Sequence, residues 1–268
     1  MRSMRGRRQT MRDTRHMTLF TGIATLAIVL TVWTLASTQG WVSPVFLPSP
    51  PQVLKAGQLL ISQGYAGSTL GAHAAASLGR VMAALVLTAL VAVPVGVLIA
   101  TSPVGRGVLD PIIEFVRPLP PLAYLPLIII WFGIGEPSKI LVIGLAMLAP
   151  IAISTAAGVR QASLGQIHAA RSLGATRGQV LWFVLLPAAL PQILTGVRIA
   201  LGAGWTTLVA AELVAAARGL GYMIQSAAQF LVTDVVIAGI LVISALAFAF
   251  EVILRIVERL FIPWARHR

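Results

Sequence analysis

The side chains that could carry chemistry are few in this chain, and they lie far apart. The sequence holds eight Asp and Glu residues, four His and no Cys. Without Cys, disulfides, thiol nucleophiles and thiolate metal sites are excluded. None of the histidines has a second ligand at helical spacing, and they stand at His16, His73, His168 and His267. The residue types therefore predict no catalytic cluster and no metal centre.

A nucleotide-binding loop is also missing from the sequence. Such a loop has the pattern G-x-x-x-x-G-K-[ST], in which backbone amides cradle the phosphates. The chain has two lysines, Lys55 and Lys139, and neither follows that glycine pattern. If the activity is driven by ATP, another chain must hydrolyse it. We expect no cofactor and no enzymatic activity in this chain.

One polar segment, residues 168–193, is too regular for a passive linker; it reads HAARSLGATRGQVLWFVLLPAALPQI. The residues before Gly174 favour a short helix, which this glycine can end in a left-handed conformation. A second helical stretch is expected over 177–186, and Pro187 and Pro191 then mark the start of the next apolar run. The pattern predicts a helix–turn–helix that projects from the apolar part of the chain.

The surface of this helix–turn–helix suits contact with another protein. Ala169 and Ala170 are small, so a partner can approach the first helix closely. Arg171 and Arg177 can pair with carboxylates across such a contact. We expect the segment to transmit force between two proteins.

The elements that must position this segment are apolar throughout. Hydrophobic residues make up 57% of the chain, charged residues 10%, and the mean hydropathy is +0.90. A soluble globule has about 25% charged residues, so most of this surface must face lipid. The net charge of +12 does not indicate nucleic-acid binding, because six Arg lie in the first 15 residues and the others are scattered singly.

Six apolar runs predict six membrane spans. A bilayer core of about 30 Å needs roughly 20 apolar residues per helix. Five runs meet or approach that length. A sixth, residues 121–135, is short, but it is counted because without it the Arg-rich loop at 160–192 would lie outside the cell. Arg198 is expected to snorkel from near one end of its span. The five longer runs are residues 17–36, 81–101, 140–159, 193–211 and 235–250.

The basic residues orient these spans. With the N-terminus inside, the segments predicted to be cytoplasmic (1–16, 102–120, 160–192 and the tail after 255) carry 15 basic residues against three outside. This agrees with the positive-inside rule. Residues 1–36 also resemble a signal peptide, but the apolar region exceeds the usual core, which favours a retained anchor.

These assignments give an all-α integral membrane protein with both termini in the cytoplasm. In the external connection, Pro51 is well placed to open a helix of about three turns. The parts are a basic tail at 1–16, a first span at 17–36, a periplasmic connection at 37–77, a core at 78–256 with its cytoplasmic loop at 160–192, and a tail at 257–268.

The projecting segment resembles the EAA loop of ABC-importer permeases. That loop has the pattern E-A-A, three residues, G, nine residues, I, any residue, L-P. Val184 stands for Ile, and His168 replaces Glu, so a salt bridge or cap from that Glu is not expected here. The residues in register are Ala169, Ala170, Gly174, Leu186 and Pro187.

The resemblance extends over nearly the whole chain after about residue 17. The stretches RPLPPLAYLPLIIIWFGIGEPSKI and LGAGWTTLVAAELVAAARGLGYMI resemble permeases of the taurine, alkanesulfonate and nitrate branch. This implies the type I importer transmembrane fold in a bacterial inner membrane, with taurine as the cargo. It further implies a second permease copy, two ATPase subunits that receive the cytoplasmic helices, and a periplasmic substrate-binding protein.

Four residues are candidates for the solute path. Trp205, Thr206 and Thr207 offer an indole N–H and hydroxyls inside a span, although such hydroxyls are commonly helix contacts. Glu212 would repel a sulfonate, so we expect it to act as a gate or to pair with Arg218.

The remaining charges are assigned to structural roles. Glu251 and Arg255, four residues apart, are expected to form a helical pair. A solvated inner loop is expected at Asp110, Glu114 and Arg117.

Three functional hypotheses remain. The first is an ATP-driven importer permease for taurine or a sulfonate. The second keeps this machinery for another alkanesulfonate, nitrate or a similar small anion. The third is a self-contained secondary carrier or a membrane enzyme, but no clear internal repeat or catalytic cluster supports it.

Overall fold

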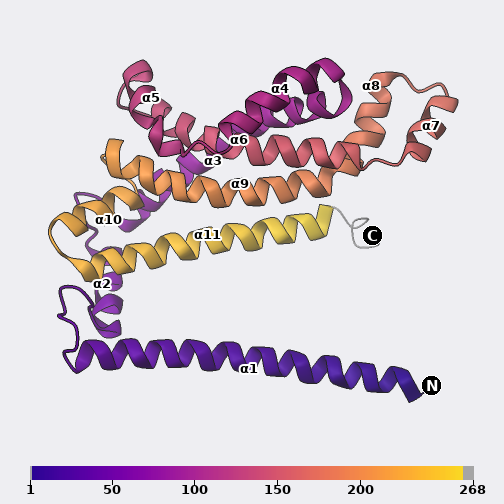
Figure 1. The fold of residues 1–268 in the computed structure, drawn as a ribbon. Coiled ribbons are helices and arrows are strands. Elements are labelled where there is room, and N and C mark those ends of the chain that lie inside the picture. The colour runs from indigo at the N-terminus through magenta and orange to yellow at the C-terminus, as the bar shows by residue number, and fades with distance from the viewer. Residues whose placement is uncertain (1, 262–268) are drawn as a thin grey trace.

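Helices make up the whole framework of the computed structural model, which describes residues 2–261 (Figure 1). No β-strand forms within that range. A 3₁₀ turn, Pro121–Ala123, and a π-helical stretch, Leu181–Leu185, interrupt the α-helices. These are α1 (Arg2–Thr38), α2 (Pro50–Ser62), α3 (Leu70–Thr101), α4 (Pro103–Val116), α5 (Leu125–Phe132), α6 (Glu136–Arg160), α7 (Leu164–Ser172), α8 (Arg177–Val180), α9 (Leu186–Ala215), α10 (Leu220–Gln229) and α11 (Thr233–Phe261).

Five helices in the described part of the chain are long and apolar enough to cross a membrane. They correspond to the five longer runs of the sequence analysis: α1, α3, α6, the continuous helix through α9, and α11. The predicted helix after Pro51 is confirmed as α2, with a proline in its first turn. The predicted tail at 257–268 lies partly in α11, and its residues 262–268 lie outside the described residues.

α3 and α6 run parallel to each other with a constant offset. Arg80 bonds Glu136. A Cβ added to Gly144 would lie 2.7 Å from Thr88 Oγ1, and one added to Gly96 would lie 2.5 Å from the Ala152 carbonyl oxygen. In each pair the two positions differ by 56. The small residues let the two backbones approach closely, as is usual in membrane helix pairs.

Because α3 and α6 are parallel, the chain between them must return across the membrane. The predicted single span at 121–135 is wrong in form: the structure has a 3₁₀ turn and the eight-residue α5, about 12 Å long at 1.5 Å per residue. α4 supplies the other part of the return, about 21 Å over its 14 residues. The return crossing therefore exists, as two short helices. Residues 110 and 114 belong to α4, so the expected solvated loop there is a helix.

Of the remaining core helices, α9 packs antiparallel to α6. Gly204 of α9 contacts Met147, and a Cβ at Gly158 would meet the Ala189 carbonyl oxygen at 2.9 Å. α11 follows α9 in the opposite direction, with Glu251 against Arg198. Figure 1 shows the start of α1, the α7–α8 hairpin and the end of α11 on one side, which is the inner side by the charge rule.

Candidate functional site

The first candidate region is the helical hairpin at the inner side, here called the elbow (residues 164–185). Gly174 has φ +84°, and its N–H donates to the Arg171 carbonyl at 2.9 Å. The Ala175 N–H donates to the Ala170 carbonyl at 3.1 Å. These two bonds form a Schellman motif, which glycine favours because a left-handed residue with a Cβ is strained. The predicted glycine cap is confirmed.

The second arm of the elbow starts with a capping box. Thr176 Oγ1 accepts from the Gln179 N–H at 3.3 Å, and Gln179 Oε1 accepts from the Thr176 N–H at 2.8 Å. Helical structure then continues through the π stretch into α9, giving one 38-residue helix over 177–214. Pro187 follows the π stretch directly, where the α-helical bonding is already interrupted. The two prolines therefore do not separate the elbow from the span.

The elbow presents its side chains to the outside. No residue of α7 is buried, and the side chains of His168, Ala169 and Arg171 are exposed. Neither Arg171 nor Arg177 forms an ion pair with any described residue. Apolar side chains are exposed as well: Leu173 to 89%, Phe183 to 78% and Trp182 to 67%.

A concavity lies on the inner face of the hairpin. Its volume is about 330 Å³. It brings together three of the predicted contact residues, Ala170, Gly174 and Val184, from both arms, so the two arms form one surface. Its lining consists of Ala170, Leu173, Gly174, Ala175, Gln179, Phe183 and Val184.

The second region is a set of polar residues near the opposite ends of the helices, here called the outer cluster (His73, Ser77, Arg80, Glu136, Lys139 and Glu212); all are buried except Glu136, which is exposed. Glu212 is fully buried. Its carboxylate accepts hydrogen bonds from Arg80 at 2.6 Å, from the Gly221 N–H at 2.8 Å and from Ser77 at 2.8 and 3.0 Å. The buried charge is thus paired and hydrogen-bonded, as a buried carboxylate requires.

Arg80 joins three other segments in this cluster. It donates to both carboxylate oxygens of Glu136 at 2.6 and 2.8 Å and to the Arg218 carbonyl at 2.7 Å. Lys139 also bonds Glu136, at 2.7 Å. The expected pairing of Glu212 with the Arg218 side chain is wrong, because Arg80 occupies the carboxylate and bonds only the backbone of residue 218.

His73 and Ser77 fix the start of α10 against α3. His73 Nδ1 accepts from the Gly219 N–H at 3.1 Å, so its Nε2 carries the proton and donates to the Tyr65 carbonyl at 3.0 Å. Ser77 Oγ accepts from the Leu220 N–H at 2.9 Å. Two otherwise unpaired amides at the N-terminus of α10 are therefore satisfied by side chains of α3.

The predicted solute-path residues are not all brought together. Thr206 and Thr207 line a pocket of about 220 Å³ between α6, α9 and the 3₁₀ turn, together with Arg117 and Tyr124. Trp205 packs against Phe250 of α11 with 6.1 Å between ring centroids, and its buried indole N–H has no hydrogen-bond partner among residues 2–261. Glu212 lies in the outer cluster. Only the two threonines share the pocket.

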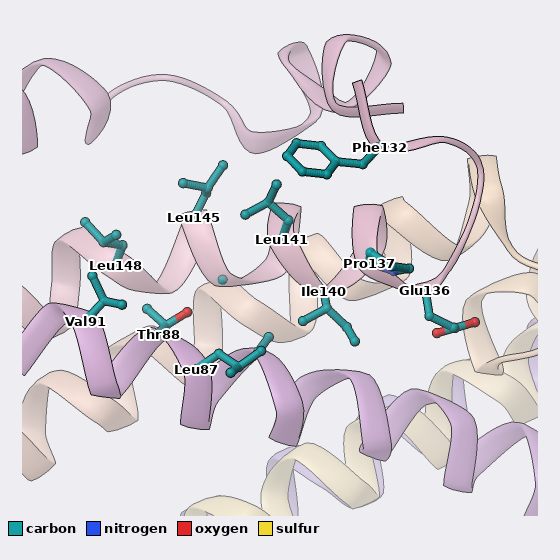
Figure 2. Close-up of a pocket in the computed structure, with 12 residues that line it drawn as sticks. Leu87, Thr88, Val91, Phe132, Glu136, Pro137, Ile140, Leu141, Leu145 and Leu148 are labelled. Atoms are coloured by element: carbon teal, nitrogen blue, oxygen red, sulfur yellow. The ribbon is translucent and has the colours of Figure 1, made fainter. Parts of the chain in front are cut away.

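A larger groove of about 680 Å³ lies between α3, α5 and α6 (Figure 2). Figure 2 shows Leu87 and Val91 of α3 facing Leu145 and Leu148 of α6. Its one charged lining residue, Glu136, is already bonded to Arg80 and Lys139. The groove offers apolar surface rather than a set of polar groups for a solute.

Part-exposed ion pairs join α9 to α11. Arg198 bonds Glu251 at 2.5 Å and lies 3.6 Å from Glu258. The predicted pair of Glu251 and Arg255 is confirmed at 3.0 Å. Arg198 is therefore held by carboxylates of α11 and does not simply reach for the membrane surface.

Sequence reasoning missed most of the outer cluster. His73 is weighed above only as a metal ligand and Lys139 only against the nucleotide-binding pattern, and Ser77 and Glu136 have no predicted role. The available signal was the position of Arg80 and Lys139 beside long apolar runs, because an ionisable residue near a membrane span usually has a buried partner. The partner itself depends on the offset between α3 and α6.

Comparisons with known proteins agree with this architecture. The family described as "Binding-protein-dependent transport system inner membrane component" matches residues 92–262. The taurine transport system permease protein TauC of Escherichia coli is 58% identical over 93% of this chain and 90% of its own length. The nitrate import permease protein NrtB of Synechocystis is 33% identical over 89% of this chain and 87% of its own length.

Solved structures share the fold. The MetNI methionine ABC transporter in an inward-facing conformation aligns with a TM-score of 0.54 at 22% identity, covering 68% of this chain and 93% of that one. A histidine-bound amino acid ABC transporter aligns with a TM-score of 0.56 at 21% identity, covering 80% and 97%. The chain therefore belongs to the binding-protein-dependent transport system inner membrane components, the permeases of ABC importers.

Proposed function

We propose that this chain is the permease subunit of an ATP-driven taurine importer. The observation that carries the proposal is the 58% identity to the taurine permease of Escherichia coli along almost the full length of both chains. An aliphatic sulfonate permease of the same organism, a putative one, is 38% identical over a similar length, which makes other sulfonates the second candidate cargo. Nitrate-like anions rank below these, in line with the 33% identity to the nitrate permease.

In this proposal two copies of the chain form the pathway and each elbow docks in a cleft of one ATPase subunit. The elbow has exposed apolar side chains, and its arginines form no ion pair within residues 2–261, which supports a protein contact there. The 38-residue helix that continues from the elbow supports transmission of ATPase closure into the membrane. The proposed contact residues are His168, Ala169, Ala170, Arg171, Gly174, Arg177, Val184, Leu186 and Pro187.

Transport then proceeds by alternating access. A periplasmic binding protein delivers the solute to the outer face, and ATP binding favours one of two helix packings through its differential contacts. Thr206 and Thr207 are retained as solute-path residues, because they line a pocket in the bundle. We assign Trp205 to helix packing and Glu212 to holding the outer end closed.

Reconstitution tests the proposal. The chain, its ATPase and its binding protein are placed in proteoliposomes, and uptake of radiolabelled taurine, ethanesulfonate and nitrate is measured with and without ATP. We expect ATP-dependent uptake of taurine in preference to the other two anions. Uptake by the chain alone would overturn the importer mechanism, and a preference for another anion would overturn the cargo.

The docking contact has its own test. Because the chain has no Cys, a single Ala170→Cys substitution provides a unique attachment site on the elbow. Cross-linking to a cysteine in the ATPase cleft is expected, whereas Gln63→Cys at the outer end of α2 serves as the negative control. Equal cross-linking at both positions, or none at Ala170→Cys, would contradict the proposed contact.

A further inference from the structure

The return crossing between α3 and α6 is broken at Arg117. This residue caps α4, with its N–H donating to the Ile113 carbonyl at 2.9 Å. Pro118, Pro120 and Pro121 follow, and prolines at these positions cannot continue the α-helical hydrogen bonds. The backbone therefore leaves the α-helix after α4 and forms only the 3₁₀ turn Pro121–Ala123 before α5 starts at Leu125.

This break lies near the middle of the membrane. α6 runs from the outer end at residue 136 to the inner end at residue 160, and Arg117 shares a pocket with its residues 145, 146, 149 and 150. At 1.5 Å per residue these positions lie about 14–23 Å from either end of α6. Interrupted helices near the bilayer midplane are a recurring feature of solute sites in transporters.

Arg117 has no counter-charge in the described part of the protein. Its side chain is exposed, and no carboxylate of residues 2–261 forms an ion pair with it. An unpaired guanidinium facing hydrocarbon at this depth is costly, so it must face a polar space or an anion. By contrast, Arg80 and Arg198 both have carboxylate partners.

The other polar groups of the pocket complement a cation. The Thr206 hydroxyl donates to the Ala203 carbonyl at 2.8 Å, so its oxygen remains available only as an acceptor. The Thr207 hydroxyl, which is largely buried, forms no hydrogen bond with a described residue. Tyr124, directly before α5, adds a phenol to the lining. The pocket thus holds a strong donor at the end of α4 and hydroxyl oxygens of α9 that can accept hydrogen bonds.

We propose that this pocket holds the solute during its crossing, with Arg117 binding the anionic group and the Thr206 and Thr207 oxygens accepting from the ammonium. A planar guanidinium donates two parallel hydrogen bonds to a sulfonate, which gives a strong and oriented contact. The volume of about 220 Å³ is below the roughly 300–1,000 Å³ of pockets for drug-sized ligands and suits a small zwitterion. This assignment rests on the proposed function and adds the residues that select a small sulfonate.

The test compares Arg117→Gln with Arg106→Gln in the complete transporter with its ATPase and binding protein. Arg106 provides a matched control because it lies on α4 near the inner end, away from the pocket. Arg117→Gln should lower taurine uptake at least about tenfold, the loss expected for one charge-assisted contact. ATP hydrolysis stimulated by the loaded binding protein should stay within about twofold. Arg106→Gln should change both readouts by less than about twofold.

Two further variants protect the test against misfolding. Arg117→Lys keeps the charge without the two-pronged geometry and should give intermediate uptake. Thr207→Val keeps the shape and should lower uptake about fivefold with ATP hydrolysis retained. Wild-type uptake by Arg117→Gln would overturn the assignment, and so would wild-type uptake by Thr207→Val if Arg117→Gln fails to fold.

Failure of the assignment is distinguishable from failure of the proposed function. If the wild type moves taurine and Arg117→Gln moves it equally well, only the pocket assignment falls. If the wild type moves another anion, the cargo is wrong and the same variants are scored with that anion. If the wild type with its partners moves no anion, both proposals are overturned.

Discussion

The outer cluster and the elbow lie at opposite ends of the same helices and are built in opposite ways. Hydrogen bonds of Arg80 reach partners 56, 132 and 138 positions away along the chain. In the elbow, the bonds that shape the turn join residues three to five positions apart. One end is thus fixed by tertiary contacts and the other by local sequence.

The two regions also differ in whether their side chains find partners within this chain. In the outer cluster the carboxylate of Glu212 and the guanidinium of Arg80 satisfy each other inside the protein. In the elbow the backbone is satisfied, while large apolar side chains such as Leu173 and Phe183 remain exposed. A region that is closed within one chain serves stability, whereas a region with exposed apolar side chains requires a partner. Substitutions should therefore affect folding at the outer end and coupling at the inner end.

The largest effect is expected for Gly174→Pro. Proline fixes φ near −65°, whereas this residue has φ +84° and donates its N–H to Arg171. The elbow would lose its shape, and ATP-driven uptake should fall by more than about a hundredfold, because a misplacement of about 1 Å can already cost roughly a hundredfold in the rate of a reaction that depends on positioning. Membrane insertion should be unchanged, as measured by the yield of folded protein in detergent.

Gly178→Ala is the control for that change. Gly178 lies in the same hairpin, has no neighbour within 4 Å of an added Cβ, and needs no left-handed backbone. Its uptake should equal that of the wild type. Normal uptake by Gly174→Pro would refute the idea that the shape of the elbow matters for coupling.

The second largest effect is expected for Glu212→Gln. The amide places an N–H₂ group where the carboxylate accepts from Ser77, Arg80 and the Gly221 N–H. Breaking a buried ion pair in this way costs about 3–5 kcal/mol of unfolding free energy. Denaturation in detergent should register the loss. A change below about 1 kcal/mol would show that water or another chain satisfies Arg80 equally well.

The contrast explains what sequence reasoning predicted and what it missed. The elbow is predictable from local signals, because the alanines, Gly174 and the later prolines each determine the backbone conformation of residues close to them in the sequence. The outer cluster depends on the parallel packing of α3 and α6, and helical periodicity contains no information on their offset. The long spans were predictable from length and hydropathy, since lipid imposes both.

The return crossing was predicted, but its form was wrong for another reason. Residues 102–120 contain charged residues and glycine, so they were assigned to a polar loop, and 121–135 was treated as one helix. In the structure α4 begins directly after α3, and Pro118 then ends the helical run before α5. Arg117 was consequently counted as a cytoplasmic charge, although it lies in a pocket with residues from the middle of α6 and α9.

A smaller effect is expected for Leu173→Ser in the elbow. Its side chain is 89% exposed and lines the concavity between the two arms, so it has little role in folding this chain. Uptake should fall about tenfold, in the range of an apolar anchor lost from an interface, and the melting temperature should not change. Leu173→Met should restore uptake. A lower melting temperature without a loss of uptake would reverse the comparison between the two ends.

The smallest effect is expected for Glu251→Gln, the same substitution as at Glu212 but in a part-exposed ion pair. Glu251 and Arg198 keep 29% and 30% of their side-chain surface, and Arg198 retains Glu258 at 3.6 Å. Pairs of this kind contribute about 0.2–1 kcal/mol. The decisive measurement is a double-mutant cycle for each pair, because a cycle isolates the coupling between two side chains. One cycle combines Glu251→Gln with Arg198→Gln, and the other combines Glu212→Gln with Arg80→Gln. Coupling at Glu212 and Arg80 should exceed that at Glu251 and Arg198 at least twofold; equal values would mean that burial does not distinguish the two ends.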